Sequence, residues 1–304
     1  MEKSNKEIWI YLAFAFGISW AVGLVLFLNG GLVNSPELIK GTGVTLALVL
    51  LASVYMWGPA IAHIITRLIT KSGWQNAYLK PKFKNHWPYW LIGWFGPGVL
   101  TLLGAVIFFL VFPENFDSQL TTLTSQLNAA GAGGELIKPA QFVIGQTILA
   151  FLLAPLLNLL ATFGEEFGWR AFLVPALTKF GYKKSLLLSG LIWGIWHWPV
   201  IMMGHNYGLD YPGFPWLGLI AMVWFTVSGG VFFGWLSLKG ESVWPAVFAH
   251  GALNGIAAIG LLFVKGPFSM LLGPTPAGLL GCLPFTIIAL IILLTSKEKS
   301  AAEV

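Results

Sequence analysis

The chain has 304 residues, of which 57% are hydrophobic and only 10% are charged, and its mean hydropathy is +0.78. Soluble domains carry about 25% charged residues, so this composition excludes a soluble globular protein and indicates an integral membrane protein. A formal net charge of +5 is compatible with a nucleic-acid partner, but the positions of the charges favour another interpretation.

Eight apolar runs are long enough to cross a hydrocarbon core of about 30 Å, which takes about 20 helical residues. The first exceeds the apolar region of about 7–15 residues in a cleaved signal peptide, and no convincing cleavage pattern follows it. We therefore expect a retained first span in an all-α, polytopic membrane helical bundle of about eight transmembrane helices, with residues 1–304 as one integral membrane domain. The runs lie near 8–28, 44–66, 89–112, 140–163, 185–203, 216–238, 242–264 and 277–295.

Lysine and arginine are distributed unevenly over the segments between these runs. With a cytoplasmic N-terminus, only Lys40, Lys138 and Lys265 of the 17 basic residues fall outside the cell. The positive-inside rule favours this orientation. Both termini are therefore predicted to be cytoplasmic, in the cell membrane, and the basic excess is assigned to topology and anionic lipid, with no nucleic-acid partner.

Two polar connections separate the early spans. The longer, about 113–139, is external in this topology, and we expect a short surface helix in it. The other, 66–88, mixes Trp and Tyr with five basic residues, which is typical of an interfacial anchor; substrate recruitment is the alternative. Cys282 is the single cysteine, which excludes an intrachain disulfide and a cysteine-based metal cluster.

The stretch "ATFGEEFGWRAF", residues 161–172, places three charges at the end of an apolar run. Glu166 and Arg170 are four residues apart, so they are predicted to form an ion pair on one helix face. Glu165 is turned about 100° away, so the same arginine cannot easily pair with both carboxylates. One carboxylate is then structural and the other free. The alternative is that the charges only mark the cytoplasmic end of the fourth span.

Two further polar clusters lie within spans. "WGIWHWP" carries His197 with Trp193 one turn earlier, and "HGALN" places His250 and Asn254 four apart on one face. Each alone is compatible with hydrogen bonding between helices. Prolines 155 and 199 also fall within spans, where each removes a backbone hydrogen bond and is expected to bend its helix.

The three clusters sit on three helices at overlapping depths, all toward the cytoplasmic half, and such convergence indicates a functional site. A carboxylate, two imidazoles and a carboxamide are sufficient for acyl hydrolysis. They provide a base that deprotonates water and donors for the tetrahedral oxyanion. No serine or cysteine nucleophile is needed if water attacks directly.

These residues resemble the motifs of the CPBP family, the CAAX prenyl protease and bacteriocin-processing intramembrane peptidases, also called the abortive-infection family. "EEFGWR" matches EExxxR, "WGIWH" matches (F/W)xxxH and "HGALN" matches HxxxN, in order and at compatible spacings. The resemblance covers about residues 141–256, the expected catalytic core. Trp193 stands where phenylalanine is common, a departure expected to alter pocket shape more than chemistry.

The resemblance implies that Glu165 and His197 activate water and that His250 and Asn254 bind the oxyanion. It assigns the predicted Glu–Arg pair a supporting role. By residue type alone, the free glutamate and the two histidines could instead supply an open zinc site. No HExxH motif is present and the family is understood as metal-independent, so no cofactor is expected.

The predicted function is that of an intramembrane endopeptidase, a metal-independent protease of the glutamic type. It would hydrolyse a peptide bond in a membrane-associated or lipid-tethered substrate, such as a prenylated CAAX protein, from a cavity that opens to the cytoplasm. The expected partners are this substrate and the lipid bilayer. The alternatives are a proton-coupled transporter, against which the lack of inverted-repeat similarity argues, and a non-catalytic immunity or scaffold protein, against which the complete motifs argue.

Overall fold

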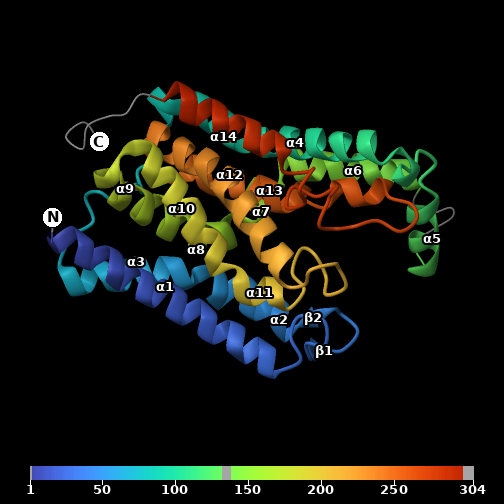
Figure 1. Cartoon of the computed structure of the whole chain (residues 1–304), viewed down its shortest axis with the longest axis horizontal. Coiled ribbons are helices and arrows are strands. Elements are labelled where there is room, and N and C mark those ends of the chain that lie inside the picture. Colours follow the sequence, from blue (N-terminus) through green and yellow to red (C-terminus); the bar gives the residue numbers. More distant parts are fainter. Residues whose placement is uncertain (1, 132–137, 297–304) are drawn as a thin grey trace.

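The computed structural model describes residues 2–131 and 138–296. Residues 132–137 of the predicted external connection, and Lys297 and Lys299, which contributed to the predicted cytoplasmic charge, lie outside the described residues. The chain forms a bundle of helices that run along one common axis, with one short hairpin as its only sheet in the described part (Figure 1). The prediction of an all-α membrane bundle is confirmed.

The order of elements follows the alternation of apolar runs and polar connections in the sequence. In chain order the elements are α1 (Glu2–Leu28), β1 (Glu37–Ile39), β2 (Val44–Thr45), α2 (Leu46–Leu50), η1 (Leu51–Tyr55), α3 (Met56–Thr70), α4 (Phe83–Val111), η2 (Pro113–Asn115), α5 (Thr121–Ala129), α6 (Pro139–Leu152), α7 (Ala154–Leu157), α8 (Leu159–Gly168), η3 (Trp169–Leu173), α9 (Val174–Leu177), η4 (Thr178–Phe180), α10 (Tyr182–Trp196), α11 (Trp198–Met202), α12 (Trp216–Gly240), α13 (Trp244–Ile256), η5 (Ile259–Phe263) and α14 (Leu283–Thr295). The strands pair antiparallel, with Glu37 opposite Thr45. The short helix expected in the connection after the third span is α5.

Five helical stretches of the described chain are long and apolar enough to cross a membrane, and they correspond to the first, second, third, sixth and seventh predicted runs. Many of their large apolar side chains are exposed at the surface of the isolated chain, as expected where lipid covers them. The stretches are Asn5–Leu28, Leu46–Thr70, Phe83–Val111, Trp216–Gly240 and Trp244–Phe263.

The other three predicted runs are broken or shortened at prolines. The fourth divides into α6, α7 and α8, with Pro155 at the start of α7, and the fifth divides into α10 and α11, with Pro199 at the start of α11. The eighth begins only at Leu283, followed by Pro284. Proline has no backbone N–H and is tolerated in the first turn of a helix, which explains why new helices begin at these positions.

The helices that carry the polar clusters lie at the centre of the bundle. Helices α1 and α3 lie side by side on one flank and α4 and α14 on the other, with α10, α12 and α13 between them (Figure 1). Close approach of α10 and α12 requires glycine, since a Cβ on Gly190 would lie 2.7 Å from the Cα of Val227. Gly168 is equally crowded by Pro59 of α3. Small residues therefore allow close approach in two pairs of helices, α10 with α12 and α8 with α3.

The two ends of the bundle differ. The start of α1 lies beside the turn before α10, because Lys179 Nζ donates a hydrogen bond to Asn5 Oδ1 at 2.7 Å. The described end of α14 reaches the same end of the bundle, whereas the hairpin, α5 and α11 lie toward the opposite end (Figure 1). We refer to these as the terminal end and the hairpin end.

Candidate active site

Two adjacent glutamates of α8 have different partners. Glu166 Oε1 accepts a hydrogen bond from Arg170 Nη1 at 3.0 Å, and the side chains of both residues are fully buried. The ion pair predicted from their spacing is therefore present. Arg170 belongs to the π-helical turn η3, a distortion often found at functional sites. The turn continues directly from α8, so the arginine remains stacked over its carboxylate.

Glu165 Oε2 accepts a hydrogen bond from Trp193 Nε1 of α10 at 2.8 Å. The same indole ring lies 4.2 Å from Cζ of Arg170, a cation–π contact. Trp193 thus donates a hydrogen bond to Glu165 from the edge of its ring and packs the face of the same ring against Arg170. The expectation that tryptophan here changes shape more than chemistry stays a prediction, although phenylalanine could not donate this hydrogen bond.

His197 stands at the break between α10 and α11. With Pro199 unable to donate, the broken helix leaves the Trp196 carbonyl to accept from Tyr55 Oη at 2.7 Å and from Trp20 Nε1 at 3.1 Å. The His197 Nδ1 contacts the carbonyl oxygen of Trp193 at 2.8 Å. Since a carbonyl only accepts, Nδ1 carries the proton, and Nε2 of the neutral ring keeps its lone pair. His197 is therefore arranged as a base.

His250 of α13 binds the same oxygen as the arginine. Its Nδ1 lies 2.8 Å from Glu166 Oε1, and an ionised carboxylate only accepts, so Nδ1 carries a proton. The ring can then donate from Nε2 only as an imidazolium. Phe233 stacks against the ring at 5.8 Å between centroids. Glu166 Oε1 thus contacts both the Arg170 guanidinium and the His250 imidazole.

A cavity of about 240 Å³ brings the candidate residues together. His197 and His250 are 9% and 5% exposed and face it, and Asn254 is exposed there. Glu165 is 3% exposed and is not itself a lining residue, but its carboxylate bonds to Trp193, which is. The lining residues from the predicted set are Trp193, His197, His250 and Asn254.

Comparison with known proteins indicates what the chain is similar to. Residues 146–256 match the family described as Type II CAAX prenyl endopeptidase Rce1-like. This stretch of the chain is similar to Rce1-like endopeptidases. CAAX prenyl protease 2 of Methanococcus maripaludis is 29% identical over 195 residues, which cover 63% of this chain and 66% of that protein, just under two thirds. The resemblance to the CAAX protease family seen in the three motifs is confirmed.

The cavity contains polar residues that the motif search missed. His205 and Asn206 follow α11 and line the cavity, as does Thr275 from the loop before α14. Asn206 has a left-handed backbone with φ of 64° and donates to Met222 Sδ at 3.6 Å. In the sequence, His205, a second histidine eight positions after His197, could have indicated that this loop belongs to the site.

The direction of the cavity bears on the predicted topology. From Trp193 and His250 the lining continues to the loop residues near 203–206 and 270–277, the half of the bundle away from the termini. A cytoplasmic opening and cytoplasmic termini were both expected, but the loops that line the cavity and the two ends of the described chain lie toward opposite ends of the bundle. The two expectations therefore do not fit one another.

The donor set of the site bears on the zinc alternative. In the described ranges, no group of three or more His, Cys, Asp or Glu side chains is arranged to hold a metal ion. Glu166 and one nitrogen of each imidazole are already engaged in hydrogen bonds. The arrangement instead places His197 and His250 on one cavity, with the buried Glu165 carboxylate bonded to Trp193 of the lining.

Proposed function

We propose that the chain is an intramembrane endopeptidase in which water is activated by Glu165 and His197. The supporting observation is the different bonding of two adjacent carboxylates. Glu166 is shared by a guanidinium and an imidazole, whereas Glu165 is held through Oε2 alone within the described chain. Glu165 Oε1 and His197 Nε2 remain available for water.

In the proposed reaction, the water oxygen attacks the carbonyl carbon of the peptide bond while Glu165 or His197 accepts the water's proton. The carbonyl electrons move to oxygen, and the resulting oxyanion accepts hydrogen bonds from the Asn254 amide and the His250 imidazolium. The oxyanion then collapses, the C–N bond breaks, and the proton passes to the leaving amine. No covalent enzyme intermediate and no metal ion are required.

The substrate we propose is a membrane-associated or lipid-tethered peptide, such as a prenylated CAAX-type protein. The name of the archaeal relative supports this class. The cavity supports it independently, because Met222, Phe225 and Leu253 supply apolar surface beside the histidines. An apolar chain next to the scissile bond would bury this surface on binding.

The direct test uses the purified full-length protein in lipid vesicles and two peptides that differ only in a prenyl group. We expect cleavage at one bond, identified by mass spectrometry, and loss of cleavage in Glu165→Gln, because the amide cannot accept the proton at neutral pH. Glu114→Gln, an exposed carboxylate far along the chain, is the matched control. Absence of cleavage by the wild type would favour the transporter or scaffold alternative. Near wild-type rates in Glu165→Gln would refute the base assignment.

The metal-independent part of the proposal has its own measurement. Prolonged treatment with a zinc chelator should leave cleavage intact, and elemental analysis should find well under one zinc per chain. Loss of activity that returns when zinc is added would show a metal enzyme instead.

We propose cytoplasmic termini in the cell membrane, on the basis of the charge distribution. Under this orientation the cavity extends toward the outer half of the bilayer, so the substrate reaches it from within the membrane or from outside. Single cysteines at Lys183 and Asn128 in a Cys282→Ser background test this. Position 183 should react with a membrane-impermeant thiol reagent only after the membrane is opened, and position 128 in intact cells. Labelling of position 183 in intact cells would reverse the topology and place the cavity toward the cytoplasm.

A further inference from the structure

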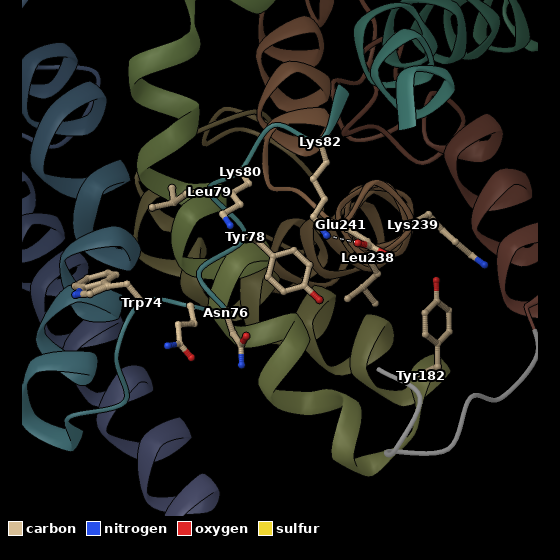
Figure 2. Close-up of a pocket in the computed structure, with 11 residues that line it drawn as sticks. Trp74, Asn76, Tyr78, Leu79, Lys80, Lys82, Tyr182, Leu238, Lys239 and Glu241 are labelled. Carbon is tan, nitrogen blue, oxygen red and sulfur yellow. Dashed lines mark hydrogen bonds and ion pairs between the residues drawn. The ribbon is translucent and has the colours of Figure 1, made fainter. Parts of the chain in front are cut away.

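A second, larger pocket of about 740 Å³ lies at the terminal end of the bundle, apart from the catalytic cavity (Figure 2). Its walls come from the loop between α3 and α4, the start of α10 and the end of α12. We call it the basic pocket. Its lining residues are Trp74, Gln75, Asn76, Tyr78, Leu79, Lys80, Lys82, Tyr182, Leu238, Lys239 and Glu241.

The charges of the basic pocket favour an anionic ligand. Lys82 forms an ion pair with Glu241, marked by the dashed line in Figure 2. The ammonium groups of Lys80 and Lys239 make no hydrogen bond or ion pair with the described residues. Three lysines and one glutamate therefore line the same pocket. A phosphate group would supply the missing negative charge.

Neutral donors lie beside the lysines. The Tyr78 side chain lines the pocket, and its hydroxyl points away from the loop into it (Figure 2). Burial, and to a smaller extent the charge of Glu241, raises the pKa of Tyr78, so the phenol keeps its proton and can donate to an anion. The Asn76 amide lies next to it. Ammonium, phenol and amide donors together match a phosphate ester.

The rim of the pocket is apolar and exposed. Trp74 is 46% exposed and Leu79 is 40% exposed, next to the unpaired lysine at position 80. Tryptophan beside lysine is typical of the membrane–water interface, where an indole lies among lipid headgroups. A ligand that carries both a phosphate and acyl chains would satisfy the donors and cover this rim.

The wall of the pocket is fixed from inside the bundle. Arg67 donates to the carbonyl oxygens of Gly73 and Asn76 and, through Nε, to His63 Nε2. The opposite nitrogen of His63, Nδ1, lies 2.7 Å from the carbonyl oxygen of Phe167 in α8. Because this carbonyl only accepts, Nδ1 of His63 donates to it and Nε2 accepts from Arg67. The neutral His63 ring therefore connects Arg67, which holds the loop, to α8, which carries the two glutamates.

The same loop also contacts α13. The Tyr78 carbonyl accepts from the Val243 N–H at 2.9 Å, and the Leu79 carbonyl accepts from Trp244 Nε1 at 2.8 Å. Tyr78 itself has a left-handed backbone with φ of 54°, a conformation that persists only where its surroundings hold it. These hydrogen bonds therefore hold the loop, and with it one wall of the pocket, in a defined conformation.

We propose that the basic pocket binds the phosphate headgroup of an anionic membrane lipid. The phosphate accepts from Lys80 and Tyr78 on one side of the pocket, Lys239 contributes positive charge from the other side, and the acyl chains leave past Trp74 into the bilayer. Each lysine near an anionic headgroup contributes about 1 kcal/mol, so removal of two should weaken binding by on the order of tenfold or more.

The test measures lipid binding to the purified full-length protein by native mass spectrometry and by thermal stabilisation in neutral detergent. Phosphatidylglycerol, phosphatidylcholine and inorganic phosphate are compared on the wild type, on Lys80→Gln/Lys239→Gln, and on Lys183→Gln/Lys184→Gln. The last pair is the matched control, because its lysines lie at the same end of the bundle but do not line the pocket. Melting temperatures without added lipid show whether each variant folds.

We expect phosphatidylglycerol to bind the wild type and the control, and to bind the pocket variant on the order of tenfold more weakly. Equal loss in both variants would show general surface attraction and overturn the proposal. Equal binding of phosphatidylcholine, or equal stabilisation by inorganic phosphate, would overturn the anionic lipid as ligand. None of these readouts depends on peptide cleavage, so they are separate from the proposed function.

Discussion

The buried Glu166–Arg170 cluster and the basic pocket satisfy their charges in opposite ways. In the cluster, Arg170 and Glu166 have fully buried side chains and are paired at 3.0 Å. In the pocket, the side chains of Lys82 and Glu241 are 44% and 53% exposed, and neighbouring lysines keep open donors. A buried charge needs a permanent partner, because no water can replace it. A charge at the membrane interface can instead remain unpaired until a ligand binds, because water solvates it.

The largest effect on folding should follow from breaking the buried pair. Glu166→Gln leaves Arg170 without its counter-charge, and a buried pair that loses one partner typically destabilises a protein by about 3–5 kcal/mol. We expect strongly reduced folded yield in membranes, measured by detergent extraction and size-exclusion profile. Glu165→Gln is the matched control, since its carboxylate accepts from Trp193 and is not in the ion pair. Equal yields of the two variants would contradict the division of roles.

Removal of an oxyanion donor should have the next largest effect, on turnover rather than on folding. We expect His250→Ala and Asn254→Ala each to lower kcat by about 10²–10³, with smaller changes in KM. Peptide cleavage under single-turnover and steady-state conditions separates the two constants. Losses confined to KM would place these residues in substrate binding. Asn254→Ala is the cleaner variant, because His250 also bonds to Glu166.

A smaller effect is expected from Trp193→Phe. Phenylalanine keeps an aromatic ring over Arg170 but removes the hydrogen bond to Glu165. A hydrogen bond to a charged group contributes about 1.5–3 kcal/mol, so kcat should fall by about 10–100-fold. The melting temperature should change little, which distinguishes a positioning role from a packing role. An unchanged kcat would show that the indole N–H is dispensable.

Local geometry explains which features were predictable from sequence. The Glu166–Arg170 pair follows from helical spacing, and the helix breaks follow from Pro155 and Pro199. Hydropathy gave eight spans because it measures the length of an apolar run and ignores where a backbone donor is missing. Five of the runs are single long helical stretches.

Long-range contacts explain what could not be predicted. Trp193 meets Glu165 across 28 positions, and His250 meets Glu166 across 84, through helix packing that no local pattern encodes. The direction of the cavity also depends on packing, since the depth of His250 along its helix does not show which end is open. The basic pocket combines segments from three separate parts of the chain, and only the interfacial character of residues 66–88 was visible in the sequence.

The smallest effect should come from Lys82→Gln, which sharpens the comparison between buried and exposed pairs. Ion pairs between exposed side chains contribute about 0–1 kcal/mol, because water screens them and long side chains lose entropy on pairing. With 44% of the lysine side chain exposed, we expect a melting temperature within a degree or two of the wild type in low salt. High salt should remove even this difference. A destabilisation as large as that of Glu166→Gln would show that the pocket's ion pair is structural, and that its lysines are held for the fold rather than for a ligand.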